Sequence, residues 1–305
     1  MTADAHPLPR AAAALAGVRP SFPGAVRSEL LKIGRQALTW VLVAGFAAVT
    51  AIVLASILSS DPARRQLAAD PAAFYFTYLN AMQQVFTTCS GVLLLVAASR
   101  LVAMEYAGGT IRIVLARGTG RLALLAAQYT ALAIVGGLLL AGFALIAAGF
   151  LYAVVIAWHG SFTPIASLPA VTWADTWRCV LAAGTSMTVC VVLGTTAAVV
   201  GRSLAFGVGA AVAFFPADNF GTFVMAFLSR LTHQDLWQNL TQWFLGPALN
   251  RLPAALQTDH LVPAAFATPL VPGVDATHCW LVIAAYFLVL LTVAVVLTWR
   301  RDVLH

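Results

Sequence analysis

Six long apolar runs separated by polar segments dominate the pattern of the chain. The runs cover residues 39–59, 80–103, 122–157, 177–200, 204–228 and 278–299. About 20 apolar residues in a helix are enough to cross the hydrocarbon core of a bilayer. The runs are continuous, whereas the strands of a membrane barrel alternate between apolar and polar residues. The pattern therefore predicts an all-α fold with six transmembrane helices, the third long enough to tilt or protrude.

Two amphipathic segments lie outside these runs. The first covers residues 22–38, and its apolar positions at helical spacing are Val26, Leu30, Ile33 and Ala37. This spacing predicts a helix that lies along the inner membrane surface before the first span. The second has an apolar stripe that ends at Gly246-Pro247 and contains Leu236, Trp237, Leu240, Trp243 and Phe244. It predicts a helix at the outer interface or a partly re-entrant segment.

Composition supports one membrane domain over residues 1–305 rather than soluble domains. Hydrophobic residues make up 61% of the chain and charged residues only 9%, whereas a soluble domain carries about 25% charged residues. Such a chain has too little polar surface to cover a water-soluble globule. We expect an integral protein of a bacterial cytoplasmic membrane, in contact with lipid.

The distribution of basic residues predicts the orientation. With a cytoplasmic N-terminus, twelve of the 17 Lys and Arg residues fall in inside segments and five in outside segments. Cytoplasmic loops of membrane proteins are enriched in Lys and Arg. Both termini (the N-terminal one comprising residues 1–38) and loop 104–121 are therefore expected inside, and loop 229–277 outside. The net charge of +6 is thus explained by topology, without a nucleic-acid partner.

The residue types needed for catalysis do not occur in the usual patterns. Lys32 is the only lysine, and the chain has no GxxxxGK[ST] phosphate loop, HExxH or GxSxG motif. The histidines are scattered through termini and loops, which disfavours a metal site. Among the four cysteines, Cys179 and Cys279 fall near the same membrane face, so a disulfide between them stays open. We expect no catalytic residues and no bound cofactor, so ATP-driven transport would need another chain.

The loop between the second and third runs carries most of the polar content on the inner side. Glu105 directly follows the second run, Gly108-Gly109 breaks the helix, and Thr110 can cap a new one. Ile111, Val114 and Leu115 then share a face. The pattern predicts a short helix parallel to the cytoplasmic surface; the alternative is a simple connector.

This loop resembles the inner loop of type-2 ABC transporter permeases. The similar residues are Glu-Tyr-x-x-Gly-Thr-Ile-Arg-x-x-Leu-Ala-Arg-Gly, at 105–118. Ser-Glu-Leu-Leu-Lys at 28–32 resembles the interfacial helix of that family, and Arg-Arg-Asp-Val at 300–303 resembles its C-terminal cap. The resemblance implies a coupling helix that rests on a separate ATP-binding-cassette subunit. The coupling residues it implies are Glu105, Gly109, Thr110, Arg112 and Arg117.

The resemblance also implies the rest of the assembly. Such permeases work in pairs, so we expect a second permease copy, identical or different, and two ATPase subunits. ATP and Mg²⁺ would bind to the ATPase partner. The expected function is that of a permease, favoured as an exporter, which forms the path and couples it to ATP hydrolysis. The alternatives are an ATP-independent carrier or channel, and a membrane scaffold or sensor that docks a regulatory ATPase.

Polar residues within the runs are candidates for the translocation path, because such residues tend to face the interior of a bundle. Asn80, Gln83 or Gln84, Thr87 and Gly91 recur at helical spacing in the second run. The fourth run has a similar row of Thr185, Thr188 and Thr195, for which simple helix packing is the favoured interpretation. The mostly apolar lining suits amphipathic or lipid-like cargo.

The segment FFPADNFG at 214–221 predicts an irregularity in the fifth span. Pro216 removes a backbone donor, and a carboxylate at Asp218 is costly in hydrocarbon. Either the helix breaks and Asp218 reaches the outer interface, or Asp218 lines a wet cavity; we favour the break. The hypothesis is that Asp218 and Asn219 shape the outer gate.

Overall fold

The computed structural model describes residues 21–107, 120–257 and 267–300, and the regular elements in these ranges are all helices. Six of them are long and apolar enough to cross a membrane. They are α3 (Ala37–Leu58), α5 (Pro71–Ala107), α7 (Arg121–His159), α9 (Ala170–Gly201), α10 (Leu204–Thr232) and α13 (Ala276–Arg300). This confirms the predicted all-α fold with six spans, and the chain is an integral membrane protein.

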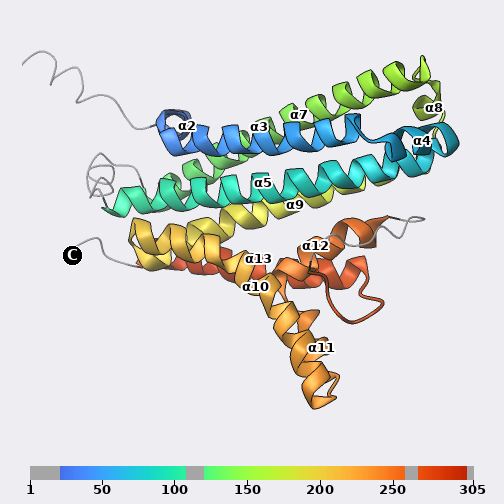
Figure 1. The fold of residues 1–305 in the computed structure, drawn as a ribbon. Helices are drawn as coiled ribbons and strands as arrows, with labels where there is room; N and C mark the ends of the chain where they lie inside the picture. Colours follow the sequence, from blue (N-terminus) through green and yellow to red (C-terminus); the bar gives the residue numbers. More distant parts are fainter. Residues whose placement is uncertain (1–20, 108–119, 258–266, 301–305) are drawn as a thin grey trace, which may run out of the picture.

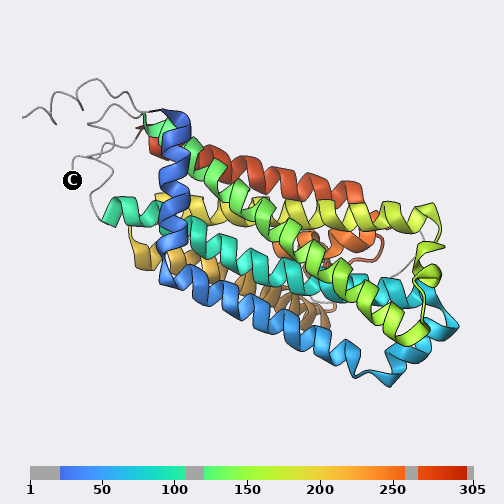
Figure 2. The same cartoon turned by 90° about the horizontal axis from the view of Figure 1, so that it is seen from above.

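Five shorter helices lie at the two ends of the bundle or beside it. They are α2 (Phe22–Arg35), α4 (Asp61–Ala69), α8 (Thr163–Ala166), α11 (Leu236–Thr241) and α12 (Leu245–Leu256). Figure 2 shows α2 lying across the bundle at one end, while α4 and α8 lie at the other end. The position of α2 is the one expected of a helix on a membrane surface.

Helices α5 and α9 form the centre of the bundle. In their most apolar stretches, 72% of α5 and 67% of α9 is buried, against 11% to 17% in the other four spans. Gly194 of α9 permits this close packing, because a Cβ atom there would lie 2.5 Å from the Leu95 carbonyl oxygen of α5. The Ser99 hydroxyl lies 3.2 Å from the Gly194 carbonyl oxygen. The outer spans therefore wrap a central pair and face lipid.

Two spans extend well beyond the hydrocarbon core. α5 has 37 residues and α7 has 39, which at 1.5 Å per residue gives lengths of about 56 and 58 Å. The core of a bilayer is about 30 Å thick. At the end remote from α2, their extensions pack with α4 and α8 around Leu67, Phe74, Val155 and Ile165.

The predicted break in the fifth span is wrong. α10 runs without interruption from Leu204 to Thr232 and contains Pro216. A proline inside a helix removes one backbone hydrogen bond and kinks the helix, but flanking turns can continue. Figure 1 shows that α10 bends and that its second half, with α11, points away from the bundle.

The outer segment differs from the predicted stripe. Helix α11 ends at Thr241, and its Leu236 and Leu240 are exposed. Gly246 and Pro247 do not end this stripe; they lie in the first turn of α12, where the missing N–H of proline costs nothing. α12 is the element that the sequence reading missed, although its buried face follows the helical spacing of Leu245, Leu249 and Leu252.

All four cysteines are free thiols. Cys179 and Cys279 are both buried, near the N-terminal ends of α9 and α13, and Cys279 belongs to the core between α9, α12 and α13. The amide of Gln257 lies 3.2 Å from the Cys179 sulfur. The disulfide that the sequence left open is therefore absent from the structure.

Candidate functional site

The surface helix α2 is anchored to the bundle by one buried face. Ser21 caps its start by accepting a hydrogen bond from the Gly24 amide. Val26, Glu29 and Ile33 are buried, at the i, i+3, i+7 spacing of one helical face. The helix packs mainly against α7 and also contacts α5. A carboxylate thus sits in the middle of an otherwise apolar contact and needs a partner.

That partner is Lys32, which also reaches the end of α5. The Lys32 ammonium donates to Glu29 Oε1 at 2.6 Å and to Glu105 Oε1. Glu29 is 1% exposed and Glu105 5% exposed. One lysine therefore bridges two buried carboxylates on helices that lie far apart in the sequence.

A second pair of contacts lies beside this bridge. Arg100 Nε of α5 donates to Gln36 Oε1 at 3.3 Å. The Gln36 amide lies 3.7 Å from the sulfur of Met104. We call the group formed by Glu29, Lys32, Gln36, Arg100 and Glu105 the α2–α5 clasp. It holds the last two turns of α5 against the surface helix.

Burial and charge act against each other in the clasp. Burial raises the pKa of Glu29, and the hydrogen bond and charge of Lys32 only partly oppose that effect. Burial alone would lower the pKa of Lys32, but the hydrogen bonds that Lys32 donates to Glu105 and Glu29 outweigh burial, and the pKa is raised. Lys32 is therefore charged throughout the physiological pH range.

The predicted coupling residues fall on both sides of the boundary of the described chain. Glu105 lies in the clasp, with its side chain buried against α2. Gly109, Thr110, Arg112 and Arg117 lie outside the described residues. The sequence did not predict that Glu29, Lys32, Gln36 and Arg100 form a contact between α2 and α5. One available signal was the single lysine, placed three residues after Glu29 on an amphipathic helix.

A groove of about 510 Å³ lies between α5, α9, α10 and α12. Its polar side chains are those of Gln84, Thr87, Thr88, Ser186, Asn219 and Asn250, and its apolar wall includes Phe215, Phe220 and Phe223. Gln84 and Thr88 are exposed on the outside of α5, and the Gln84 amide donates to the Thr88 hydroxyl. The groove thus joins amides and hydroxyls to aromatic surface.

Two of the five predicted path residues, Thr87 and Asn219, line this groove. Asn80 and Gln83 do not line it, and the Asn80 amide donates to the Phe76 carbonyl of its own helix at 2.7 Å. The alternative glutamine, Gln84, is the one that lines the groove. An i, i+3, i+4 pattern alone cannot decide between adjacent glutamines, because the rotation of α5 depends on its neighbours.

Asp218 and Asn219 join the bent helix α10 to α12. Asp218 Oδ2 accepts a hydrogen bond from the Gly246 amide. Asn219 Oδ1 accepts one from the Asn250 amide at 3.1 Å, and Asn250 also donates to the Ala267 carbonyl at 3.1 Å. We call these four side chain and backbone groups, on Asp218, Asn219, Gly246 and Asn250, the outer latch. Here the carboxylate satisfies an amide at the start of α12.

The threonine row of α9 supports the favoured interpretation as packing. The hydroxyls of Thr185, Thr188 and Thr195 each donate to the carbonyl four residues earlier, at 2.8 to 2.9 Å. Such bonds satisfy a hydroxyl within its own helix.

The comparisons with known proteins agree with this arrangement. The sequence profile of the family described as ABC-2 family transporter protein matches residues 25–218. The matched range begins within α2, includes the whole clasp and ends in α10 at Asp218. No curated protein gives a significant match to the chain. The match covers more than half of the chain and includes four of its six spans completely and the first half of α10, so the chain belongs to the ABC-2 transporter family, as a membrane-spanning permease of an ABC transporter.

Proposed function

We propose that the chain is the permease subunit of an ATP-driven exporter in a bacterial cytoplasmic membrane, driven by a separate ATPase through the α2–α5 clasp. One observation carries the proposal: Lys32 ties the surface helix to Glu105, three residues before the loop that begins at residue 108. The last turns of α5 and α2 are thereby joined on the side where this loop emerges.

The clasp gives a physical route for coupling. A partner that pushes on loop 108–119 displaces the end of α5, and the ionic bridge makes α2 move with it. Packed elements of this kind shift as rigid bodies rather than deform continuously. Because α5 is a central helix of the bundle, its movement reaches the groove near Thr87. ATP and Mg²⁺ belong to the partner, since this chain has no phosphate loop.

The groove is the proposed translocation path, and it favours a paired permease. Gln84 and Thr88 are exposed on a membrane-spanning helix, and amides facing hydrocarbon are costly. A second permease copy placed over this face would cover them and close the groove into a shared path. Polar groups beside Phe220 and Phe223 suit an amphipathic cargo with a polar end and an apolar body.

Filling the groove is expected to block transport but spare assembly. A Thr88→Trp substitution places a bulky ring beside Gln84, so we expect at least a tenfold loss of transport in vesicles that contain the permease and its ATPase. Leu145→Trp is the matched control, because Leu145 is 75% exposed on α7 and does not line the groove. Equal transport by both variants would rule out this groove as the path.

Charge reversal in loop 108–119 tests the ATPase partner. We expect the double variant Arg112→Glu/Arg117→Glu to lose most co-purification with its cassette ATPase. Arg64→Glu/Arg65→Glu, which changes the same charge in α4 at the other end of the bundle, should retain it. A permease that transports without any ATPase would instead support an ATP-independent carrier, and one that binds the ATPase but moves no cargo would support a scaffold or sensor.

A further inference from the structure

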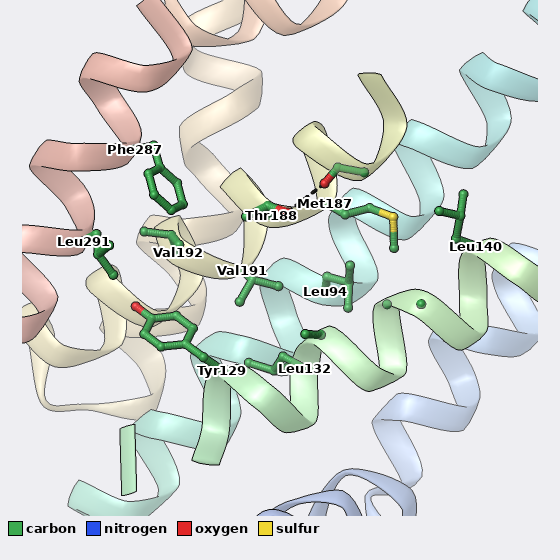
Figure 3. A pocket seen from close by; sticks show the side chains of 14 residues that line it. Leu94, Tyr129, Leu132, Leu140, Met187, Thr188, Val191, Val192, Phe287 and Leu291 are labelled. Atoms are coloured by element: carbon green, nitrogen blue, oxygen red, sulfur yellow. Dashed lines mark hydrogen bonds between the residues drawn. The ribbon is translucent and has the colours of Figure 1, made fainter. Parts of the chain in front are cut away.

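A second cavity, separate from the groove, opens on another face of the bundle. It has a volume of about 430 Å³ and lies between α7, α9 and α13, with Leu94 of α5 at its base. In Figure 3, Tyr129 of α7 lies on the same side of the view as Phe287 and Leu291 of α13, and Leu140 of α7 lies on the opposite side, next to Met187 of α9. The proposed export function does not use this cavity, and none of its lining residues belongs to the clasp or the outer latch.

We call this second cavity the crevice, and its shape follows from how α7 and α13 meet. At the end near the termini, Arg121 Nη1 of α7 donates to the Trp299 carbonyl of α13 at 3.3 Å, which brings the two helices together. Tyr129 and Leu291 are the lining residues nearest to this contact, each eight residues away along its helix, or about 12 Å. The crevice therefore begins below a closed end and opens sideways into the bilayer.

Its lining is almost entirely hydrocarbon. The hydroxyl of Thr188 is satisfied by the Gly184 carbonyl at 2.8 Å, which leaves the Tyr129 hydroxyl as the remaining polar side-chain group. Gly137 on α7 and Gly184 on α9 contribute no side chain, and a Cβ atom at either position would meet nothing within 4 Å. Water has too few partners to fill such a space.

The length and depth of the crevice favour one occupant. From Tyr129 to Leu140 the lining spans about 16 Å along α7, close to half of the hydrocarbon core of about 30 Å. That is the depth of one leaflet. The rims are lipid-facing helices, with Leu138 and Leu288 exposed next to the opening. Arg121 and Arg300 lie at its closed end, at the level where phosphate headgroups belong.

We propose that the crevice between α7, α9 and α13 is a binding site for one acyl chain of a membrane phospholipid from the leaflet nearer the termini. The chain fills the space left by Gly137 and Gly184 and supports α7, which otherwise has little contact with α9. The bound lipid is thus a structural component of the permease and not its cargo.

Photo-crosslinking in vesicles tests the site. The full-length chain is reconstituted with a phospholipid that carries a diazirine in its acyl chain, and labelled peptides are mapped by mass spectrometry. We expect labelling concentrated at residues 129–140 and 184–192. Gly137→Leu should lower it several-fold, as should Gly184→Leu from the opposite wall. Gly149→Leu is the control, because Gly149 is exposed on α7 and does not line the crevice.

Thermal stability in detergent shows whether a leucine substitution fills the crevice or damages the fold. Added phospholipid should raise the Tm of the wild-type chain, since a ligand that binds only the folded state stabilises it. Gly137→Leu should already have a higher Tm without lipid and should gain less from it, because the leucine occupies the cavity. Labelling that is spread evenly over exposed α3, or unchanged in both leucine variants, would overturn the proposal. Cross-links between two chains through this face in place of lipid labelling would also overturn it.

Discussion

Replacing Lys32 with methionine is expected to uncouple transport from ATP hydrolysis. The substitution leaves Glu29 and Glu105 buried without their shared cation. Removing one partner of a fully buried ion pair costs about 3–5 kcal/mol. Because the Lys32 side chain is 39% exposed, we expect a smaller cost of about 2 kcal/mol. Coupling free energies of about 1–3 kcal/mol correspond to changes of roughly 5–150-fold, so transport per ATP should fall by at least tenfold.

The measurement is substrate transport and ATP turnover in the same reconstituted complex. Arg35→Met is the matched control, because it removes one positive charge from an exposed site on the same helix. The triple variant Lys32→Met/Glu29→Gln/Glu105→Gln also removes the two carboxylate charges that Lys32 bridged and should recover part of the coupling. Normal coupling in Lys32→Met would show that the clasp does not transmit movement between α5 and α2. A coupling defect of equal size in Arg35→Met would show that the defect comes from the loss of surface charge and not from the clasp.

Replacing Asp218 with alanine is expected to release α12 from α10. The substitution leaves the Gly246 amide without its acceptor, and an unsatisfied buried donor costs about 1–3 kcal/mol. The amide is therefore expected to exchange its hydrogen roughly 5- to 150-fold faster if the latch opens as a local unit. Transport should fall as well, because Asn219 and Asn250 of the latch also line the groove.

An asparagine at the same position separates charge from hydrogen bonding. Asp218→Asn keeps an oxygen that can accept from Gly246, so we expect near-normal exchange and near-normal transport. That result would exclude a gating role for the negative charge itself. Asp235→Ala, at an exposed position before α11, is the control for loss of an acidic side chain. Unchanged exchange at Gly246 in Asp218→Ala would contradict the latch.

The outer segment shows how far local patterns can be trusted. The stripe from Leu236 to Phe244 has the spacing of a helix, yet α11 ends at Thr241 and its Leu236 and Leu240 stay exposed. The following segment has Pro247 and Pro253 near the two ends of its apolar face. Two prolines argue against a helix, but the segment nevertheless forms α12. Proline is harmless in the first turn, and burial of Leu245, Leu249 and Leu252 against α9 and α13 outweighs the second proline.

The sequence by itself determined the six spans, because crossing a bilayer needs only enough consecutive apolar residues and these runs are unambiguous. It also determined that the chain has no phosphate loop of its own, and it marked α2 and loop 104–121 as amphipathic or polar interruptions. Tertiary structure alone decided which helices are central. α5 and α9, with mean hydropathies of 1.8 and 1.7, are less apolar than α3 and α7, with 2.6 and 2.5, but α10 is the least apolar at 1.4 and only 11% of its most apolar stretch is buried. Apolar composition therefore does not tell a central helix from one that faces lipid.

The polar contacts were decided in the same way. Glu29, Lys32 and Glu105 come together only because α2 lies across the bundle and brings residues 73 positions apart into contact. The choice of Gln84 over Gln83, and the pairing of Asp218 with Gly246, likewise depend on how α5 and α10 rotate against their neighbours. Rotation and crossing are set by packing between side chains of different helices, such as Gly194 against Leu95, and a linear pattern within one helix carries no record of them.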